Sequence, residues 1–167
     1  MNTPKPEEAW VASVNMHIRN VGRVLSMFCE QLMDKALFHD ASKKQSPEAE
    51  VFAEYTPKLK TVVFLSDEYK QNLADMGPAL QHHYANNSHH PEHFPNGVAG
   101  MTLSDLIEMF ADWYVASMRK REGDPAKSVA MNAERFGFDP QLTQILLNTI
   151  PEMADTVYVQ KLEYEDA

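Results

Sequence analysis

The chain has 167 residues, of which 44% are hydrophobic and 23% are charged. Because a chain of this length can bury a core without disulfide or metal staples, we expect residues 1–167 to form a single domain. Its 15 Lys and Arg against 24 Asp and Glu give a net charge of −9. That balance argues against binding a nucleic-acid backbone or an anionic membrane, since both need clustered cations.

The sequence also predicts where the protein resides. No apolar run approaches the roughly 18 residues that a membrane span needs. The start, MNTPKPEEAW, lacks the apolar region of a signal peptide. Cys29 is the single cysteine, which excludes an intramolecular disulfide and fits a reducing interior. We therefore expect a soluble cytoplasmic protein.

The strongest periodic segment is the first, over residues 7–37. Its apolar residues recur at spacings of three and four, as on one face of an amphipathic helix: Trp10, Val14, Ile18, Val21, Leu25, Phe28 and Leu32. The length of this segment predicts a helix that forms the spine of the fold. His17 lies on the same stripe, where a histidine can be either a hydrogen-bonded core residue or a ligand.

Shorter helices follow, and capping residues mark their ends. Ser46 and Asp124 each precede a proline, Thr102 and Asp105 have the spacing of a capping box, and Gly137 suits a helix end. These signals predict helices over 47–56, 66–86, 103–121, 125–136 and 140–149, with a final turn or two after residue 151. Only residues 61–65 (TVVFL) resemble a strand. The expected fold is an all-α, single-domain bundle of six or seven helices.

Histidines are concentrated in one part of the chain. Five of the seven lie within residues 82–93: His82, His83, His89, His90 and His93. Neutral imidazole binds zinc, iron and related divalent ions when carboxylates complete the coordination. The cluster indicates a metal site, although a polar or pH-sensitive loop remains an alternative.

Carboxylates that could complete such a site lie on either side of this cluster. Asp40 follows His39 directly after an apolar pair, and a buried carboxylate needs a partner such as a metal. Asp105, Glu108 and Asp112 share one face of the helix predicted to begin near residue 103. We expect Asp105 to be solvated, and Asp112 to lie near the core with a cation or a histidine as its partner.

In chain order, His17, His39-Asp40, His83, His89 or His90, and Asp112 resemble the ligand order of the HD-domain metal-dependent phosphohydrolases. The stretch from His39 to Lys43 is similar to the HD-x-[GS]-K motif of the binuclear members. The blocks FHDASK, SPEAEVFAEY, HHYANNSHHPEHF and MTLSDLIEMFADW, within residues 38–113, resemble a small phage and bacterial family of uncharacterised HD-like proteins. The resemblance implies an HD-like helical fold.

The resemblance also implies a ligand set. His17, His39, Asp40 and Asp112 would hold a first ion, and Asp40 would bridge to a second. His83 with one or both of His89 and His90 would hold that second ion. One or two divalent ions, from among Mn, Fe, Zn, Co, Ni and Mg, are expected. The chain lacks the GYP tripeptide of the HD-GYP type, which weighs against hydrolysis of cyclic dinucleotides.

The expected function is metal-dependent hydrolysis of a small phosphate ester, with a nucleotide as the first choice. Asp40, Lys43 and Glu108 are the catalytic candidates. Lys43 would bind a phosphate oxygen, unless it is ordinary solvated surface, and Glu108 would either orient a histidine or act as a base. The alternatives are a di-iron oxygenase of the same fold and a non-catalytic, metal-stabilised binding module. Apolar residues on several helices permit a homodimer.

Overall fold

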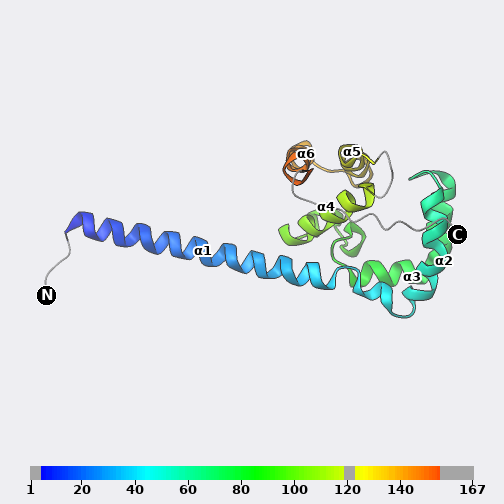
Figure 1. The fold of residues 1–167 in the computed structure, drawn as a ribbon, viewed down its shortest axis with the longest axis horizontal. Coiled ribbons are helices and arrows are strands. Elements are labelled where there is room, and N and C mark those ends of the chain that lie inside the picture. Colours follow the sequence, from blue (N-terminus) through cyan, green and yellow to red (C-terminus); the bar gives the residue numbers. More distant parts are fainter. Residues whose placement is uncertain (1–4, 119–122, 155–167) are drawn as a thin grey trace. The chain divides into compact units, whose positions relative to one another are not determined.

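The computed structural model describes residues 5–118 and 123–154. Within these ranges every regular element is helical, which confirms the all-α prediction. The elements are α1 (Pro6–Phe38), η1 (Ala41–Lys44), α2 (Glu48–Thr61), α3 (Asp67–Asn86), η2 (Pro91–His93), η3 (Gly97–Gly100), α4 (Leu103–Met118), α5 (Pro125–Phe136) and α6 (Pro140–Ala154), drawn in Figure 1. The six α-helices agree with the expected six or seven. None of the helices in the described ranges is long and apolar enough to cross a membrane.

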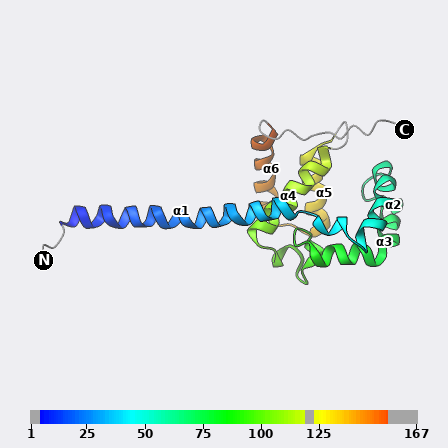
Figure 2. The same cartoon turned by 60° about the horizontal axis from the view of Figure 1, so that its bottom comes forward.

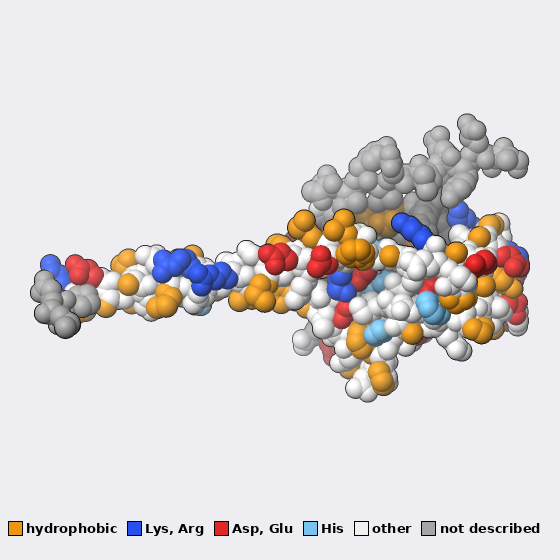
Figure 3. Space-filling model, turned by 90° about the horizontal axis from the view of Figure 1, so that it is seen from below, with side chains coloured by type: hydrophobic (Ala, Val, Ile, Leu, Met, Phe, Trp, Pro, Cys, Tyr) orange, Lys and Arg blue, Asp and Glu red, His pale blue; other side chains and the backbone are white. Residues whose placement is uncertain are grey.

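Contacts divide the chain into two compact units, Met1–Phe38 and His39–Ala167. The first unit contains α1, a helix of 33 residues in which no residue is buried. Apolar side chains are exposed along its length (orange in Figure 3), from Trp10 at 67% to Leu37 at 74%. The predicted long first helix is therefore confirmed. Its role as the spine of a single bundle stays a prediction.

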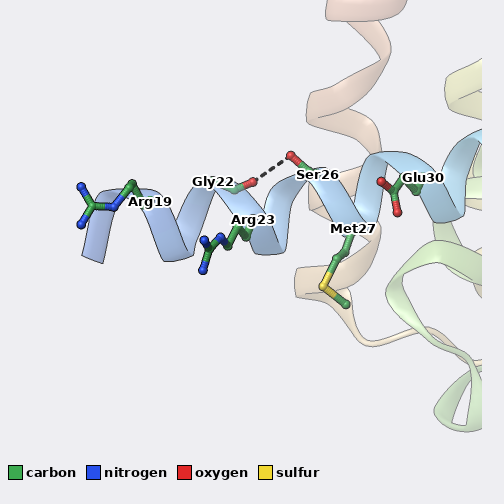
Figure 4. A pocket seen from close by; sticks show the side chains of 6 residues that line it. All are labelled: Arg19, Gly22, Arg23, Ser26, Met27 and Glu30. Atoms are coloured by element: carbon green, nitrogen blue, oxygen red, sulfur yellow. Dashed lines mark hydrogen bonds between the residues drawn. The ribbon is translucent and has the colours of Figure 1, made fainter. Parts of the chain in front are cut away.

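One hollow on the first unit belongs to α1 alone. Its lining residues all come from this helix (Figure 4): Arg19, Gly22, Arg23, Ser26, Met27 and Glu30. The Ser26 hydroxyl donates to the Gly22 carbonyl at 3.0 Å, a bond to the preceding turn of the same helix. The hollow is thus part of one helix surface.

An apolar core joins α4, α5 and α6 of the second unit, which lie together in Figure 2. Phe110, Val129 and Leu146 are buried at its centre. Around them pack partly buried apolar side chains: Phe138, Leu142, Leu147, Ile150 and Met153. The predicted Asp124 cap is confirmed, because its carboxylate accepts from the amides of residues 126 and 127. Gly137 ends α5 with a φ of 66°, the left-handed conformation that glycine adopts easily.

The other end of the second unit is built from α2 and α3, which pack against one another. α3 is kinked at Gly77, whose φ of 45° and ψ of −121° are accessible mainly to glycine. The segment after the kink carries His82 and His83. The direction of that segment therefore sets where the imidazole of His83 points.

Several boundaries differ from those predicted. Residues 62–65 form a bend and a turn between α2 and α3 rather than a strand, since this short apolar stretch pairs with no other strand in the described ranges. α2 continues through Pro57 to Thr61, and α6 continues through Pro151 to Ala154. Ser46 makes no cap, because Pro47 occupies the cap position of α2. The predicted helical residues 119–121 lie outside the described ranges.

Candidate metal centre

The first two residues of the candidate site lie in the turn that follows α1. Asp40 has φ 54° and ψ 20°, a left-handed conformation that aspartate tolerates better than most residues. Its backbone carbonyl accepts from the amide of Lys43 at 3.0 Å, which begins η1. The turn thus requires a residue that accepts the left-handed region, and Asp40 meets that need while supplying a carboxylate.

The other residues of the site come from α3, the loop after it, and α4. His83 lies near the end of α3, and the loop begins at Asn87. The side-chain amide nitrogen of Asn87, Nδ2, donates to the His83 backbone carbonyl at 2.7 Å and to the Ser42 hydroxyl at 2.8 Å. These bonds tie the loop to α3 and η1, and so position the following residues, His89 and His90.

Three histidines and Asp40 form the first group of possible ligands, His83, His89 and His90 being the histidines. His83 Nε2 lies 3.4 Å and His89 Nε2 3.6 Å from Asp40 Oδ1. His90 Nε2 lies 2.8 Å from His83 Nε2. Ligands about 2.0–2.1 Å from a shared ion, at angles between 90° and 110°, are separated by about 2.9–3.4 Å. The observed separations are therefore close to those between neighbouring ligands of one ion.

A second group of possible ligands shares Asp40. His39 Nε2 lies 3.4 Å from Asp40 Oδ2 and 3.8 Å from Asp112 Oδ1. Within each group, one ligand atom per residue lies within 4.8 Å of every other. Asp40 belongs to both groups, so it is the residue able to bridge two ions. Six of the seven predicted ligands are thus brought together: His39, Asp40, His83, His89, His90 and Asp112.

Two polar atoms at the centre of this cluster lack hydrogen-bond partners. Asp40 Oδ1 and His89 Nε2 are buried, and no group in the described part of the chain donates to or accepts from them. They face each other at 3.6 Å. If His89 Nδ1 donates to Glu108, its Nε2 carries a lone pair, so two acceptors are directed at the same space. Buried acceptors without a donor are costly, and a cation placed there would satisfy both.

Glu108 holds two of the histidines in this orientation. Its Oε1 lies 3.0 Å from His39 Nδ1 and 3.2 Å from His89 Nδ1. Carboxylates commonly accept from the outer ring nitrogen of metal-binding histidines, which fixes the tautomer and leaves Nε2 for the ion. The contacts favour the orienting role over the alternative role of a base.

Glu48 is a second orienting carboxylate, and the sequence reasoning missed it. This residue is fully buried, with 0% of its surface exposed. It accepts from His83 Nδ1 at 2.8 Å, His82 Nδ1 at 2.7 Å and the Ser42 hydroxyl at 2.9 Å. In the sequence Glu48 reads only as an acidic residue in the first turn of a helix. No local signal distinguishes it from a solvated one.

The charges of the cluster shift the pKa values of its members. Contacts with the carboxylates of Asp112 and Glu108 raise the pKa of His39 to about 10, against the opposing effect of burial. Burial, with the neighbouring His89 and His83, lowers the pKa of His90 to about 2. His39 therefore holds a proton between carboxylates where a metal would otherwise supply the positive charge, whereas His90 is neutral and ready to act as a ligand.

The three remaining histidines are not members of the groups of possible ligands. His17 lies on α1, in the first unit, with an exposed side chain, and it is absent from the groups of possible ligands. Its role as a ligand stays a prediction. His82 is bonded to Glu48, and His93 Nδ1 contacts the carbonyl of Tyr84 at 2.8 Å. Of the five clustered histidines, His83, His89 and His90 are thus possible ligands, whereas His82 and His93 are not members of the ligand groups.

The expectation for Asp105 was wrong. Its side chain is buried at 5% exposure rather than solvated. It accepts from Ser88 at 2.5 Å and from the Thr102 amide at 2.9 Å, and the Asp105 amide in turn donates to the Thr102 hydroxyl at 3.2 Å. The predicted capping box is therefore present. Asp105 connects the start of α4 to the loop that begins at Asn87 and carries His89 and His90, which we call the histidine loop.

Lys43 lies beside the cluster and at the edge of a cavity. Its Nζ donates to Asp40 Oδ2 at 2.5 Å and sits 5.1 Å from the centre of the Phe52 ring. The cavity, of about 540 Å³, is lined by Lys43 together with His83, His90 and Asp112. Histidine side chains (pale blue) also reach the surface of this unit in Figure 3. The cluster is thus accessible to a small molecule.

The fold and the cluster define an all-α protein with a candidate histidine–carboxylate metal centre. The family described as "Family of unknown function (DUF5662)" matches residues 7–152, so the chain belongs to that family. No curated protein and no solved structure matches the chain.

Proposed function

We propose that this protein is a metal-dependent phosphohydrolase that acts on a small phosphate ester. The observation that carries the proposal is a pair of buried polar atoms, Asp40 Oδ1 and His89 Nε2, which face each other inside a histidine–carboxylate cluster and have no hydrogen-bond partner within the described residues. A hydrogen-bonded core would have paired these atoms, whereas a metal site leaves them free for the ion.

The residues suited to hold metal are four histidines and two aspartates: His39, His83, His89, His90, Asp40 and Asp112. Bound divalent ions supply Lewis acidity there, which lowers the pKa of a water molecule and offsets the charge of a phosphate. Both histidines and carboxylates are present, a set that suits Mn, Fe, Zn, Co or Ni better than Mg.

The surrounding residues have distinct parts in such a reaction. Glu108 and Glu48 keep ring nitrogens of His39, His89 and His83 directed inward. Lys43 presents an ammonium group to the cavity beside Asp112, where it can neutralise a phosphate oxygen as a point charge. Asp40 interacts with this ammonium, so the lysine is held next to the cluster.

The relationship to the HD-domain phosphohydrolases, a nucleotide as substrate and a cytoplasmic location belong to the same proposal. The inward-facing set of histidines and aspartates supports the first of these, because it contains all the residues that the resemblance assigned except His17. The single cysteine supports the last.

The test combines metal analysis with a hydrolysis panel. Protein purified without chelator should contain Mn, Fe, Zn, Co or Ni, and it should hydrolyse phosphate esters, nucleotides among them, when one of these ions is supplied. Asp112→Asn should lose both properties. The matched control is Asp67→Asn, since Asp67 is fully exposed in the first turn of α3. A metal-loaded wild type that hydrolyses no ester would contradict the proposal, and an oxygen-sensitive iron absorption band would then indicate an oxygenase.

A further inference from the structure

The cavity beside the candidate metal centre is much larger than a phosphate group requires. It measures about 540 Å³, of which the phosphate end is marked by Lys43 and Asp112. Small-molecule sites of this size enclose most of their ligand. The remaining walls therefore describe the organic part of whatever molecule binds here.

The part of the cavity wall that α2, α3 and the turn between them form is largely apolar. The lining there consists of aliphatic and aromatic side chains: Leu59, Val62, Phe64, Leu73, Met76 and Leu80. Val62 and Met76 are 8% and 2% exposed, so this part of the wall is anchored in the interior of the unit. A sugar bound against it would bury hydroxyl groups without partners, which is costly.

Flat aromatic rings also form part of the cavity wall. Trp113 from α4 and Phe136 from α5 line the cavity, and their rings are nearly parallel, with an interplanar angle of 7° and centroids 6.0 Å apart. Arg135 also lines the cavity, but its guanidinium is paired with Glu92 at 2.7 Å. Polar and charged side chains from α4, α5 and the N-terminal cap of α5 line the cavity as well: Ser117, Asp124, Lys127, Ser128 and Asn132.

We infer that the cavity binds the organic group of the substrate and that this group is a large apolar one containing a ring system. The inference rests on the proposed hydrolase function and replaces the nucleotide of that proposal with another class of ester: phosphate monoesters of bulky, ring-bearing alcohols. The phosphate lies at the end marked by Lys43 and Asp112, and the ring lies among the apolar walls. Burial of the ring supplies selectivity over small, polar phosphate esters.

The test compares two esters with the same type of leaving group. 2-(1-Naphthyl)ethyl phosphate and ethyl phosphate both release a primary alcohol, so their chemistry is matched and only the apolar group differs. With the Mn²⁺-loaded full chain, we expect kcat/KM to favour the naphthyl ester by about tenfold or more, the scale on which apolar pockets discriminate.

Ala116→Trp tests whether this preference arises in the cavity. Ala116 is an exposed residue of α4 that lines the cavity, so an indole there would obstruct it without entering the core. The preference should fall to near unity in this variant. Ala130→Trp is the matched control, because Ala130 is an exposed helical alanine outside the cavity lining, and it should retain the preference.

The outcomes separate this inference from the proposed function. Equal turnover of both esters, or a preference that survives Ala116→Trp, would overturn the inference and leave the hydrolase proposal standing. If neither ester is hydrolysed while nucleotides are, the inference is overturned and the proposed function stands. If no phosphate ester is hydrolysed, the proposed function fails, and calorimetric titration with 2-(1-naphthyl)ethanol decides whether the cavity binds an apolar ring. Binding that Ala116→Trp abolishes and Ala130→Trp retains would support an apolar ring site, and absence of binding to the wild type would overturn it.

Discussion

The two ends of the unit His39–Ala167 are built on opposite principles. Around α4, α5 and α6 the buried centre is apolar, with Phe110, Val129 and Leu146 in contact. Around α2, α3 and the histidine loop, fully buried side chains include Glu48, His83 and His89. Apolar burial favours folding without any partner, whereas buried polar groups are tolerated only when each is hydrogen-bonded, ion-paired or bound to metal.

The comparison indicates a division of labour within the unit. The apolar end supplies stability that is independent of ligand, and it can therefore support a polar end containing unpaired acceptors. Asp40 Oδ1 and His89 Nε2 have no hydrogen-bond partner there among residues 5–118 and 123–154. Stability of the polar end should depend on metal, and stability of the apolar end should not.

Among the substitutions that change the effect of metal, the largest effect is expected for Asp40→Ala. The substitution deletes the carboxylate shared by the two ligand groups and also places alanine at a φ of 54°. At metal concentrations about 100 times Kd, the wild type should gain about 2.7 kcal/mol of stability, and the variant should gain almost none. Thermal unfolding with and without Mn²⁺ measures this gain.

Asp40→Asn separates the two consequences of that substitution. Asparagine accepts the left-handed conformation as readily as aspartate, so the metal-free fold should be closer to wild type than that of Asp40→Ala. Metal-dependent stabilisation should still be lost with the charge. Wild-type stabilisation by metal in Asp40→Ala would show that the cluster is not the metal site.

Leu146→Ala should have the opposite effect: it should lower the stability of the unit and leave metal binding unchanged. Leu146 is 5% exposed at the centre of the apolar core, and truncation of a buried leucine costs about 2–5 kcal/mol. We expect denaturant unfolding to show this loss while metal stoichiometry at saturating Mn²⁺ stays that of the wild type. If the variant also loses metal at temperatures where it is folded, the two ends are not separable.

The helices could be predicted from the sequence, because their signals are local. Asp124 and Gly137 bound α5 as expected, since a cap and a left-handed terminus depend only on neighbouring residues. The C-terminal ends of α2 and α6 could not be predicted, because the sequence indicated that each helix stops before its proline, Pro57 or Pro151. Each helix continues through its proline, so the residue signalled a boundary that the packed helix does not have.

The composition of the candidate site was predictable, as was an orienting role for Glu108, but the other supporting carboxylates were not. His39, Asp40 and Asp112 stood out because charged residues beside apolar ones need partners. Glu48 and Asp105 did not stand out, since their burial depends on residues distant in the sequence: Glu48 on His82 and His83, and Asp105 on Ser88. A sequence shows which side chains can bind, whereas burial of the carboxylates that orient them is decided by tertiary packing.

Lys43→Ala should alter the reaction at the polar end without altering the metal. Its ammonium contacts Asp40 and lines the cavity, but it is not among the possible ligands. Loss of one such electrostatic contact typically lowers turnover by about ten- to a thousandfold. Lys44→Ala is the control, because Lys44 is the exposed neighbour. Metal content and hydrolysis rate are measured on the same preparations, and full activity in Lys43→Ala would remove the residue from the site.

The smallest of these effects, and the sharpest test of the comparison, is expected for Glu48→Gln. The substitution keeps the shape of the side chain but replaces one carboxylate oxygen with an NH₂ group. That group can only donate, and it meets either the donor from His82, if it replaces Oε1, or the donors from His83 and Ser42, if it replaces Oε2. The orientation of His83 should loosen, and metal affinity should fall by about 10- to 100-fold, as is usual when such an orienting partner is lost.

The control for Glu48→Gln is Glu54→Gln, on the same helix. Glu54 is exposed and pairs with Lys58 at 2.7 Å, so this substitution should leave metal affinity as it is. Competition with a chelator gives the affinity, and thermal unfolding of the metal-free protein gives the stability. If Glu48→Gln lowers the stability of the metal-free protein and leaves metal affinity intact, then Glu48 only holds the fold together. In that case the polar end resembles the apolar end in function, since its buried groups stabilise the unit rather than prepare it for an ion.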